Sequence, residues 1–386
     1  MKKHARFLTT LLAAALLVVA ALPSAFADPF KYTAVAGTST TFDKYLVMDA
    51  DANVPNATFK FTVAPGDAIA ATNTSVAVLA GIGTPTIADV TFAPGNTTYT
   101  TKQGTDEVTL VSGQKYAKQT VTVSFSGISF PEPGIYRYIV TETATTNQGV
   151  TNDESETRTL DVYVTDNDGA LEVSSYVLHT GTDAPAAGAD KGSADVSNTG
   201  DKLGDKSAGY TNTYDTSNLT FSKTVSGNQA SRDKYFAFTV TISGAVAGTV
   251  YDVDLTKADV NISANPNDAT TCIGNAVTQP QRLTVPADGT VTRVFYLQHS
   301  QEITIKGLAK GTEYAVTENP EDYKQTAPDN ASGTIVSEDV TAAFTNTRSG
   351  VIPTGVLLTV APFAAIMAVG AVGIIVMVGK KRKRAE

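Results

Sequence analysis

Segments in which apolar and polar residues alternate recur along this chain, and this pattern predicts β-strands. Three kinds of segment occur twice, in the same order: "TFDKYLVM" and "LTFSKTVSG", then "PGIYRYIVTET" and "KGTEYAVTENP", then "GYTNTYD" and "AFTNTRSG". A set of strands that repeats in order indicates two similar units in tandem. The sequence therefore predicts an all-β protein with two related domains.

Strand parity places polar residues on the apolar face of these predicted strands. Successive side chains of a strand point to opposite faces, so residues two apart share a face. Lys44 shares its face with Phe42 and Leu46, and Lys223 shares its face with Phe221 and Val225. The same argument gives one lysine, one glutamate and one asparagine on the inward face of each repeat: Lys44, Glu142 and Asn212 in the first, and Lys223, Glu318 and Asn346 in the second.

Two interpretations of these inward polar residues are open. They could lie at strand ends, where they reach solvent or form an ordinary buried ion pair with an amide nearby. However, burying unpaired charge costs several kcal/mol, and the same three residue types occur twice in the same order. The repetition favours a chemical role over coincidence.

The chemistry that fits a buried lysine, glutamate and asparagine is an intramolecular amide bond. Burial disfavours charge, so we expect the lysine to tend towards the free amine and the glutamate towards the neutral acid. The amine can then attack the asparagine side-chain carbonyl while the glutamate moves protons and ammonia leaves. A fold that holds these groups together supplies effective molarities of about 10⁵ M or more, so no external enzyme is needed.

The N-terminus predicts export. Residues 1–27 have a basic start, an apolar stretch from Phe7 to Leu22 and the small-residue step Ala25-Phe26-Ala27. This is typical of a secretory signal peptide, and the mature chain is expected to begin near Asp28. The alternative is an uncleaved membrane anchor, which Pro23 and the Ala-x-Ala step disfavour.

Residues 350–386 combine a short motif, a predicted membrane span and a basic tail. The apolar run from Val356 to Gly379 is long enough to cross a bilayer, and the cluster from Lys380 to Arg384 should stay in the cytoplasm. The arrangement resembles the cell-wall sorting signal of Gram-positive surface proteins. In that family a transpeptidase, the sortase, cleaves between Thr and Gly.

The sorting motif here is "VIPTG". The resemblance implies cleavage between Thr354 and Gly355, with Pro353 presenting the bond, and Ile352 departs from the commoner leucine, which suggests a dedicated transpeptidase. The alternative is a plain anchor in which Pro-Thr-Gly merely ends the extracellular part.

Composition narrows the function classes. A net charge of −9 argues against nucleic-acid binding. The single cysteine, Cys272, cannot form a disulfide within the chain, and we assign it no chemistry. The segment Asp49–Asn53 begins like a calcium loop but lacks the required glycine and glutamate, and the isolated His179 and His299 give neither a zinc site nor a catalytic triad. We predict no metal, no cofactor and no enzyme acting on an external substrate.

The lysine in the first strand, the late "Y-x-V-T-E" segment and the "[YF]-T-N" of the last strand resemble the isopeptide-linked, immunoglobulin-like (CnaB-type) domains of Gram-positive backbone pilins, especially the two-domain streptococcal major pilin. The likeness covers most of residues 41–348 and implies two tandem β-sandwiches, 28–216 and 217–349, joined by the short "DTSN". It implies Lys44–Asn212 and Lys223–Asn346 bonds, with Glu142 and Glu318 as catalysts. Domain 1 differs from domain 2 because a long segment, from Asn147 to Gly209, lies between its glutamate and its asparagine.

The resemblance also implies assembly outside the cell. A pilus-class sortase would join Thr354 of one subunit to a lysine of the next, giving a head-to-tail polymer that also takes minor pilins or a peptidoglycan precursor. The Tyr-Pro-Lys-Asn acceptor motif of many pilins is missing, but the two-domain type uses a lysine just before the last strand of its first domain. The resemblance therefore implies Lys206, or alternatively Lys202, as the acceptor. The precursor would be secreted and membrane-anchored before it reaches the wall or pilus. The alternatives are a wall-anchored adhesin or minor pilin that binds a host or matrix ligand, and, more remotely, a surface enzyme.

Overall fold

The structure, a computed structural model, describes residues 38–71, 76–181, 206–262 and 277–351. The predicted signal peptide, Lys202, Cys272, the motif from Ile352 to Gly355 and the predicted membrane span lie outside the described residues. Every regular element that the structure describes is a β-strand. No described helix has the length and apolar character to cross a bilayer. The predicted all-β class is confirmed.

Domain 1 is a sandwich of two sheets. One sheet has the order β10 (Val150–Thr151), β13 (Gly209–Tyr214), β1 (Ser39–Asp49), β8 (Gln114–Ser124) and β5 (Thr86–Ile87), with β7 (Thr98–Tyr99) also paired to β8. The other has the order β12 (Ala170–Thr180), β11 (Thr157–Asn167), β9 (Gly134–Glu142) and β3 (Phe61–Pro65), with β4 (Leu79–Ala80) also paired to β9. A separate ribbon joins β2 (Ala57–Phe59) to β6 (Val90–Phe92).

Domain 2 repeats this architecture. Its larger sheet has the order β19 (Arg282–Thr284), β16 (Val250–Asp254), β21 (Glu302–Ala309), β14 (Thr216–Ser226), β25 (Val340–Thr347) and β23 (Lys324–Thr326). Its smaller sheet has the order β20 (Val291–Leu297), β15 (Phe236–Ser243), β22 (Glu313–Glu318) and β24 (Ser332–Thr334). A ribbon joins β17 (Asn261–Ile262) to β18 (Val277–Thr278).

Each sandwich encloses its own apolar core. The inward positions of β14 show why these strands form, because Leu219, Phe221 and Val225 are all at most 1% exposed while the outward-facing Thr220, Ser222 and Thr224 are more open. Alternation of this kind buries one face of a strand and leaves the other polar. Aromatic side chains fill much of both cores, for example the edge-to-face pair of Phe42 and Phe61.

The first and last strands of each domain lie side by side and run parallel. In domain 1, β1 pairs with β13, with Lys44 opposite Tyr210. In domain 2, β14 pairs with β25, with Lys223 opposite Phe344. The register is the same in both domains, since the asparagine lies opposite the residue two positions after the lysine. The strand that begins each domain is therefore next to the strand that ends it.

The predicted connection "DTSN" is shorter than expected. Strand β14 already begins at Thr216, so only Asp215 separates it from the end of β13 at Tyr214. The backbone N–H of Asp215 donates to Gly149, and the backbone N–H of Lys310 donates to Asp215. Contacts with both domains thus hold the connection in place.

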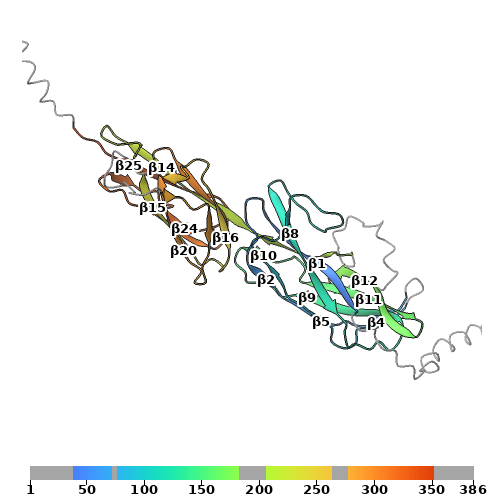
Figure 1. The fold of residues 1–386 in the computed structure, drawn as a ribbon. Helices are drawn as coiled ribbons and strands as arrows, with labels where there is room; N and C mark the ends of the chain where they lie inside the picture. Colours follow the sequence, from blue (N-terminus) through green and yellow to red (C-terminus); the bar gives the residue numbers. More distant parts are fainter. Residues whose placement is uncertain (1–37, 72–75, 182–205, 263–276, 352–386) are drawn as a thin grey trace, which may run out of the picture.

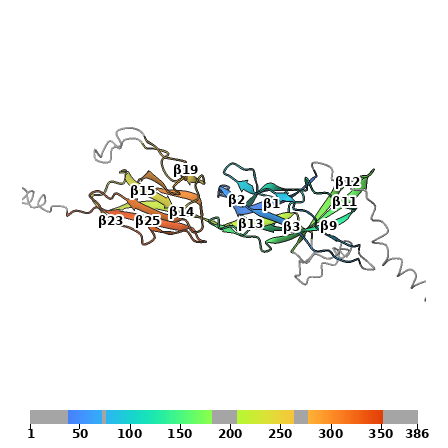
Figure 2. The same cartoon turned by 90° about the horizontal axis from the view of Figure 1, so that it is seen from below.

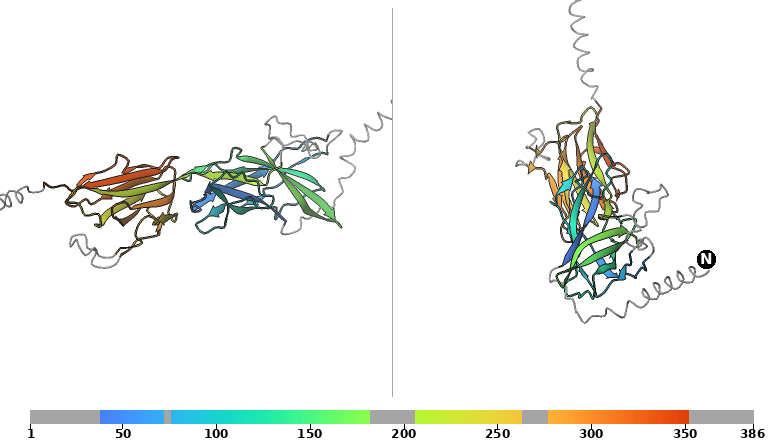
Figure 3. Two further views of the ribbon diagram at one scale, coloured as in Figure 1. Left: turned by 90° about the horizontal axis from the view of Figure 1, so that it is seen from above. Right: turned by 90° about the vertical axis from the view of Figure 1, so that its right-hand side faces the viewer.

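The two sandwiches lie end to end, as Figures 1 and 2 show, and the views in Figure 3 give the same elongated shape. Strand β1 ends at the junction, and β14 begins there and runs away from domain 1. Gly350, which follows the last strand, hydrogen-bonds to Asn228 just after β14, so the described chain leaves domain 2 at the end opposite the junction.

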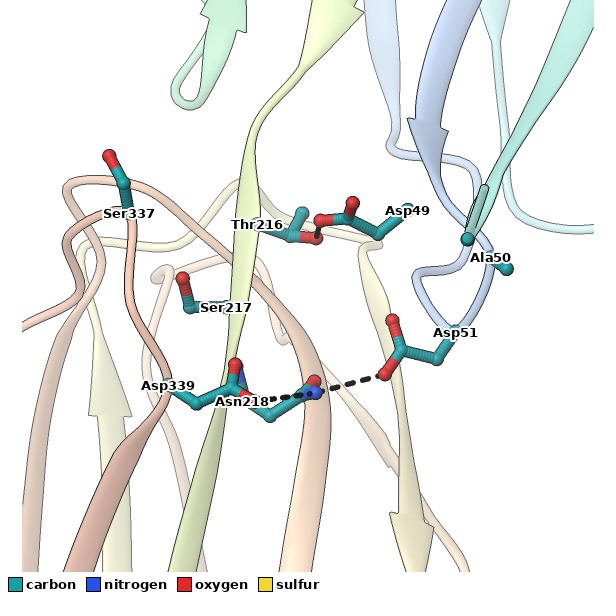
Figure 4. A pocket seen from close by; sticks show the side chains of 9 residues that line it. Asp49, Ala50, Asp51, Thr216, Ser217, Asn218, Ser337 and Asp339 are labelled. Atoms are coloured by element: carbon teal, nitrogen blue, oxygen red, sulfur yellow. Dashed lines mark hydrogen bonds between the residues drawn. The ribbon is translucent and has the colours of Figure 1, made fainter. Parts of the chain in front are cut away.

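Short polar side chains join the domains across this junction. Thr216 donates to Asp49 over 2.9 Å, and Asn218 donates to Asp51 over 2.9 Å. Asp49, Asp51 and Asn218 line a cleft of about 500 Å³ between the domains (Figure 4). Asn53 also donates to Asp252 of domain 2. The segment that begins like a calcium loop therefore makes interdomain hydrogen bonds.

Candidate cross-link sites

The Lys44 site lies inside the domain 1 sandwich. Lys44 comes from β1 and Asn212 from the neighbouring β13, whereas Glu142 ends β9 in the opposite sheet. The structure brings all three predicted residues together and buries them, with exposed fractions of 0%, 0% and 2%.

The three side chains are close enough to react. Lys44 Nζ lies 2.9 Å from each carboxylate oxygen of Glu142 and 2.5 Å from Asn212 Oδ1. Asn212 Nδ2 donates to Glu142 Oε1 over 3.0 Å. The amine thus faces the carbonyl group, and the carboxylate contacts both the amine and the amide nitrogen that would leave.

The Lys223 site repeats this arrangement in domain 2. Lys223 and Glu318 form a buried ion pair, with neither side chain exposed. Asn346 Nδ2 donates to Glu318 Oε1 over 2.7 Å. The carbonyl oxygen of Asn346 is buried and accepts no hydrogen bond from the described residues. Both sets of three predicted residues therefore converge, each inside its own core.

Burial changes the protonation of the reacting groups. Desolvation lowers the pKa of Lys44 to about 8, although the Glu142 carboxylate opposes this shift. Desolvation likewise lowers the pKa of Lys223 to about 8, against the effect of Glu318. Burial raises the pKa of Glu142. These directions favour a free amine and a carboxyl group that holds its proton longer, as expected for buried groups.

An aromatic ring lies beside each lysine. Lys44 Nζ is 4.7 Å from the ring centroid of Phe59, and Lys223 Nζ is 4.3 Å from that of Phe236. Phe61 and Phe238, two residues further on, lie opposite Glu142 and Glu318 in the strand register. The rings exclude water from both sites, which strengthens the electrostatic interactions inside them.

Two sets of neighbours were not predicted from the sequence. In domain 2, Gln325 on β23 lies opposite Asn346 and donates to Glu318 Oε2 over 2.7 Å. In domain 1, the backbone N–H of Asp153 donates to Asn212 Oδ1 over 3.0 Å. The β-strand pattern carries no signal for either, because Asp153 lies in a loop and the position of Gln325 depends on a pairing between distant segments.

Other predicted residues have different surroundings. Lys206 is exposed, and its backbone forms an isolated bridge with His179 at the end of β12. His179 Nε2 lies 3.8 Å from Asp161, which Arg137 binds through two nitrogens. His299 Nδ1 accepts the backbone N–H of Val225. Neither histidine contacts the cross-link residues through these interactions.

Comparisons with known proteins follow the division into two domains. Residues 41–215 match the family described as "Spy0128-like isopeptide containing domain", and residues 217–348 match a "Domain of unknown function (DUF7601)". A curated protein named "Pilin" from Streptococcus pyogenes serotype M1 is 26% identical over 375 residues, covering 90% of this chain and 92% of that protein.

Solved structures of similar architecture come from the same organism. The crystal structure of the major pilin from Streptococcus pyogenes is 22% identical, covers 82% of this chain and all of that chain, and gives a TM-score of 0.48. The major pilin T3.2 of that organism is 20% identical, with 80% and 99% covered and a TM-score of 0.46.

Proposed function

We propose that this chain, whose first domain belongs to the Spy0128-like isopeptide-containing family and which is a streptococcal-type pilin, is a shaft subunit of a covalently polymerised pilus. Proteins of the pilin class are structural components of the Gram-positive cell surface, not enzymes. Two self-catalysed Lys–Asn bonds would stabilise the subunit, and a sortase would join it to its neighbours through Thr354.

The observation that carries the proposal is the duplicated buried site. Lys44, Glu142 and Asn212 meet in one core, and the corresponding three residues meet in the other with the same strand register. A single buried ion pair has a purely structural explanation. The occurrence of the same three groups in both cores fits bond formation better, because in each core the glutamate contacts both the lysine amine and the asparagine amide nitrogen.

The proposed reaction balances within the three side chains. The free amine of the lysine attacks Cγ of the asparagine, and the carbonyl oxygen takes up negative charge. The glutamate accepts a proton from the lysine nitrogen and delivers one to the asparagine Nδ2. The bond from Cγ to Nδ2 then breaks, ammonia leaves, and an amide joins the two strands.

Assembly would use the sorting motif of one subunit and a surface lysine of another. The sortase would cleave between Thr354 and Gly355 and transfer the Thr354 carbonyl to Lys206 of another copy. Support for this choice comes from the exposure of Lys206 and from its position just before β13. Its partners would be the pilus-class sortase, identical subunits, and minor pilins or a peptidoglycan precursor. The secreted precursor would stay anchored in the membrane until this transfer.

The experiment that tests assembly is a denaturing gel of cell-wall extract from cells that express the chain with a pilus sortase. The unmutated protein should give a ladder of high-mass species. Thr354→Ala should abolish both the ladder and wall attachment, because no acyl donor remains.

Lys206→Ala should stop chain growth but leave single subunits on the wall, because a donor needs only its own C-terminus. Lys202→Ala is the control and should polymerise normally. Full ladders from both lysine variants would place the acceptor elsewhere, and failure of Lys202→Ala alone would identify that lysine instead. If the unmutated protein gave no ladder, the wall-anchored adhesin would become the better interpretation.

A further inference from the structure

The two cross-link sites differ in what faces the asparagine carbonyl oxygen. In domain 1, Asn212 Oδ1 accepts the backbone N–H of Asp153 over 3.0 Å in addition to the Lys44 amine. In domain 2, the corresponding oxygen of Asn346 accepts no hydrogen bond from the described residues. The difference concerns the atom on which negative charge develops when an amine attacks a carboxamide.

We propose that the Asp153 backbone N–H is the oxyanion donor for bond formation in domain 1, and that the Asp153 carboxylate and Arg158 are the residues that position it. This inference rests on the proposed isopeptide chemistry. A preorganised donor aimed at a developing oxyanion is one of the larger single contributions to catalysis.

Several hydrogen bonds fix the orientation of Asp153. Its Oδ2 accepts the backbone N–H of Thr211 over 2.7 Å and Arg158 Nη2 over 3.0 Å, and its Oδ1 accepts the backbone N–H of Ser155 over 2.9 Å. Thr211 directly precedes Asn212. The carboxylate thus connects the loop that carries the donor N–H to the strand that carries the reacting amide.

Arg158 is in turn held by domain 1. Its Nε donates to the carbonyl of Gly209 over 3.0 Å, its Nη1 donates to the carbonyl of Ser155 over 2.6 Å, and its guanidinium lies 4.4 Å from the ring centroid of Tyr210. The side chains of Arg158 and Asp153 are only 7% and 10% exposed. Buried charge-assisted bonds of this kind are stronger and geometrically more specific than exposed ones.

The donor N–H also selects the orientation of the asparagine amide. Since a backbone N–H needs an acceptor, it must face Oδ1 and not the NH₂ group, which directs Nδ2 towards Glu142. The nitrogen that must leave therefore lies beside the carboxylate that supplies its proton. In domain 2, Gln325 donates to Glu318 Oε2, which leaves Oε1 to accept the amide nitrogen of Asn346.

The test is the rate of bond formation in each domain of the full ectodomain, isolated unfolded in denaturant before the bonds form and then diluted into native buffer. Acid-quenched samples are digested, and the Lys44–Asn212 and Lys223–Asn346 peptides are quantified by mass spectrometry. Asp153→Ala keeps the backbone N–H but removes the contacts that position it, so it should slow the domain 1 bond by about tenfold, less than the roughly 10²–10³-fold cost of losing an oxyanion donor outright. The domain 2 bond should form at the unmutated rate.

If Asp153 acted only through its charge, Asp153→Ala should speed up bond formation in domain 1 instead of slowing it. The Asp153 carboxylate raises the pKa of Lys44, so its removal alone would give more free amine and a faster reaction. Measuring at pH 9, above the Lys44 pKa of about 8, removes most of this effect, and the slowing should persist there. Asp153→Asn keeps one acceptor oxygen for Thr211 and should restore part of the rate. Gln325→Ala should slow only the domain 2 bond.

Folding of each variant is followed by hydrogen exchange of the domain 1 strands, and rates are expressed per folded molecule. If Asp153→Ala does not fold, Asp153→Asn decides the question by the same comparison. A folded Asp153 variant that forms the domain 1 bond at or above the unmutated rate would overturn the inference. Absence of both bonds from the unmutated chain would instead refute the proposed function on which it rests.

Discussion

Glu318 contacts both Lys223 and Asn346 in domain 2. Its removal therefore tests whether the glutamate is needed for bond formation while both residues that would be joined remain in place. In Glu318→Ala, Lys223 and Asn346 remain but the proton carrier is lost, and the bond should not form. Burial already lowers the pKa of Lys223 to about 8, and loss of Glu318 removes the interaction that opposes this shift, so the buried amine can lose its charge in the variant. By analogy with a disulfide that closes a loop of about 100 residues, the free energy of unfolding should fall by about 4–5 kcal/mol.

Glu313→Ala is the matched control, because Glu313 lies on the same strand β22 but is exposed. This variant should keep the cross-link and nearly all of the stability. Tryptic mapping and denaturant titration measure both properties. A Lys223–Asn346 peptide recovered from Glu318→Ala in unmutated yield would refute the role of this glutamate.

The pH dependence of bond formation follows from the lysine pKa values. Because the pKa values of Lys44 and Lys223 are lowered to about 8, the free-amine fraction should rise about fiftyfold between pH 6 and pH 8. Both bonds should therefore form much faster at pH 8 than at pH 6 when the unfolded chain is diluted into buffer. Quenched samples analysed by mass spectrometry give the rates, and a rate that falls over this interval would contradict nucleophilic attack by the amine.

The residues of both sites could be found from the sequence because parity and repetition locate them. Lys223 falls between Phe221 and Val225 in an alternating strand, and the structure buries all three. The supporting contacts could not be found in this way. Asp153 contacts Asn212 through its backbone N–H, which any residue except proline offers, so the identity of this residue gives no signal in the sequence.

At the scale of elements, the parallel pairing of the first and last strands of each domain determines which segments the proposed cross-links would join. Lys223 on β14 and Asn346 on β25 are neighbours in space but are separated by most of domain 2 in sequence. The sequence alone does not give this register, because parallel pairing between distant strands leaves no turn signal to fix it. The start of β14 extends into the predicted connection because Thr216 and Ser217 pair with Ala309 and Leu308 of β21.

This topology predicts how the subunit responds to pulling at its ends. Force entering at β14 and leaving near β25 would pass through the Lys223–Asn346 amide, so domain 2 should not lengthen. In Glu318→Ala, the roughly 120 residues between the two strands should unfold and add about 400 Å of contour length.

Single-molecule force measurements on the ectodomain test this prediction, and domain 1 of the same variant is the internal control because its bond should remain. Unfolding of domain 2 in the unmutated protein to the full extra length would show that the bond is absent or bypassed.

At the scale of the whole molecule, the two domains lie end to end and form a short rod (Figure 1). Interdomain hydrogen bonds from Thr216 and Asn218 to Asp49 and Asp51 span the junction. The repeat in the sequence indicated two tandem domains, but the sequence pattern did not predict that the residues from Asp49 to Asn53 would form interdomain hydrogen bonds. Short polar residues such as Asp, Asn and Thr are common both in loops and in polar interfaces, so their presence in the sequence does not distinguish the two.

The intact mass of the folded ectodomain tests the central claim most directly. A chain in which both sites have reacted should be lighter than its sequence predicts by the mass of two ammonia molecules, and digestion should yield Lys44 joined to Asn212 and Lys223 joined to Asn346. A mass equal to that of the unmodified chain would contradict the account, because the two buried sites would then be ordinary ion pairs.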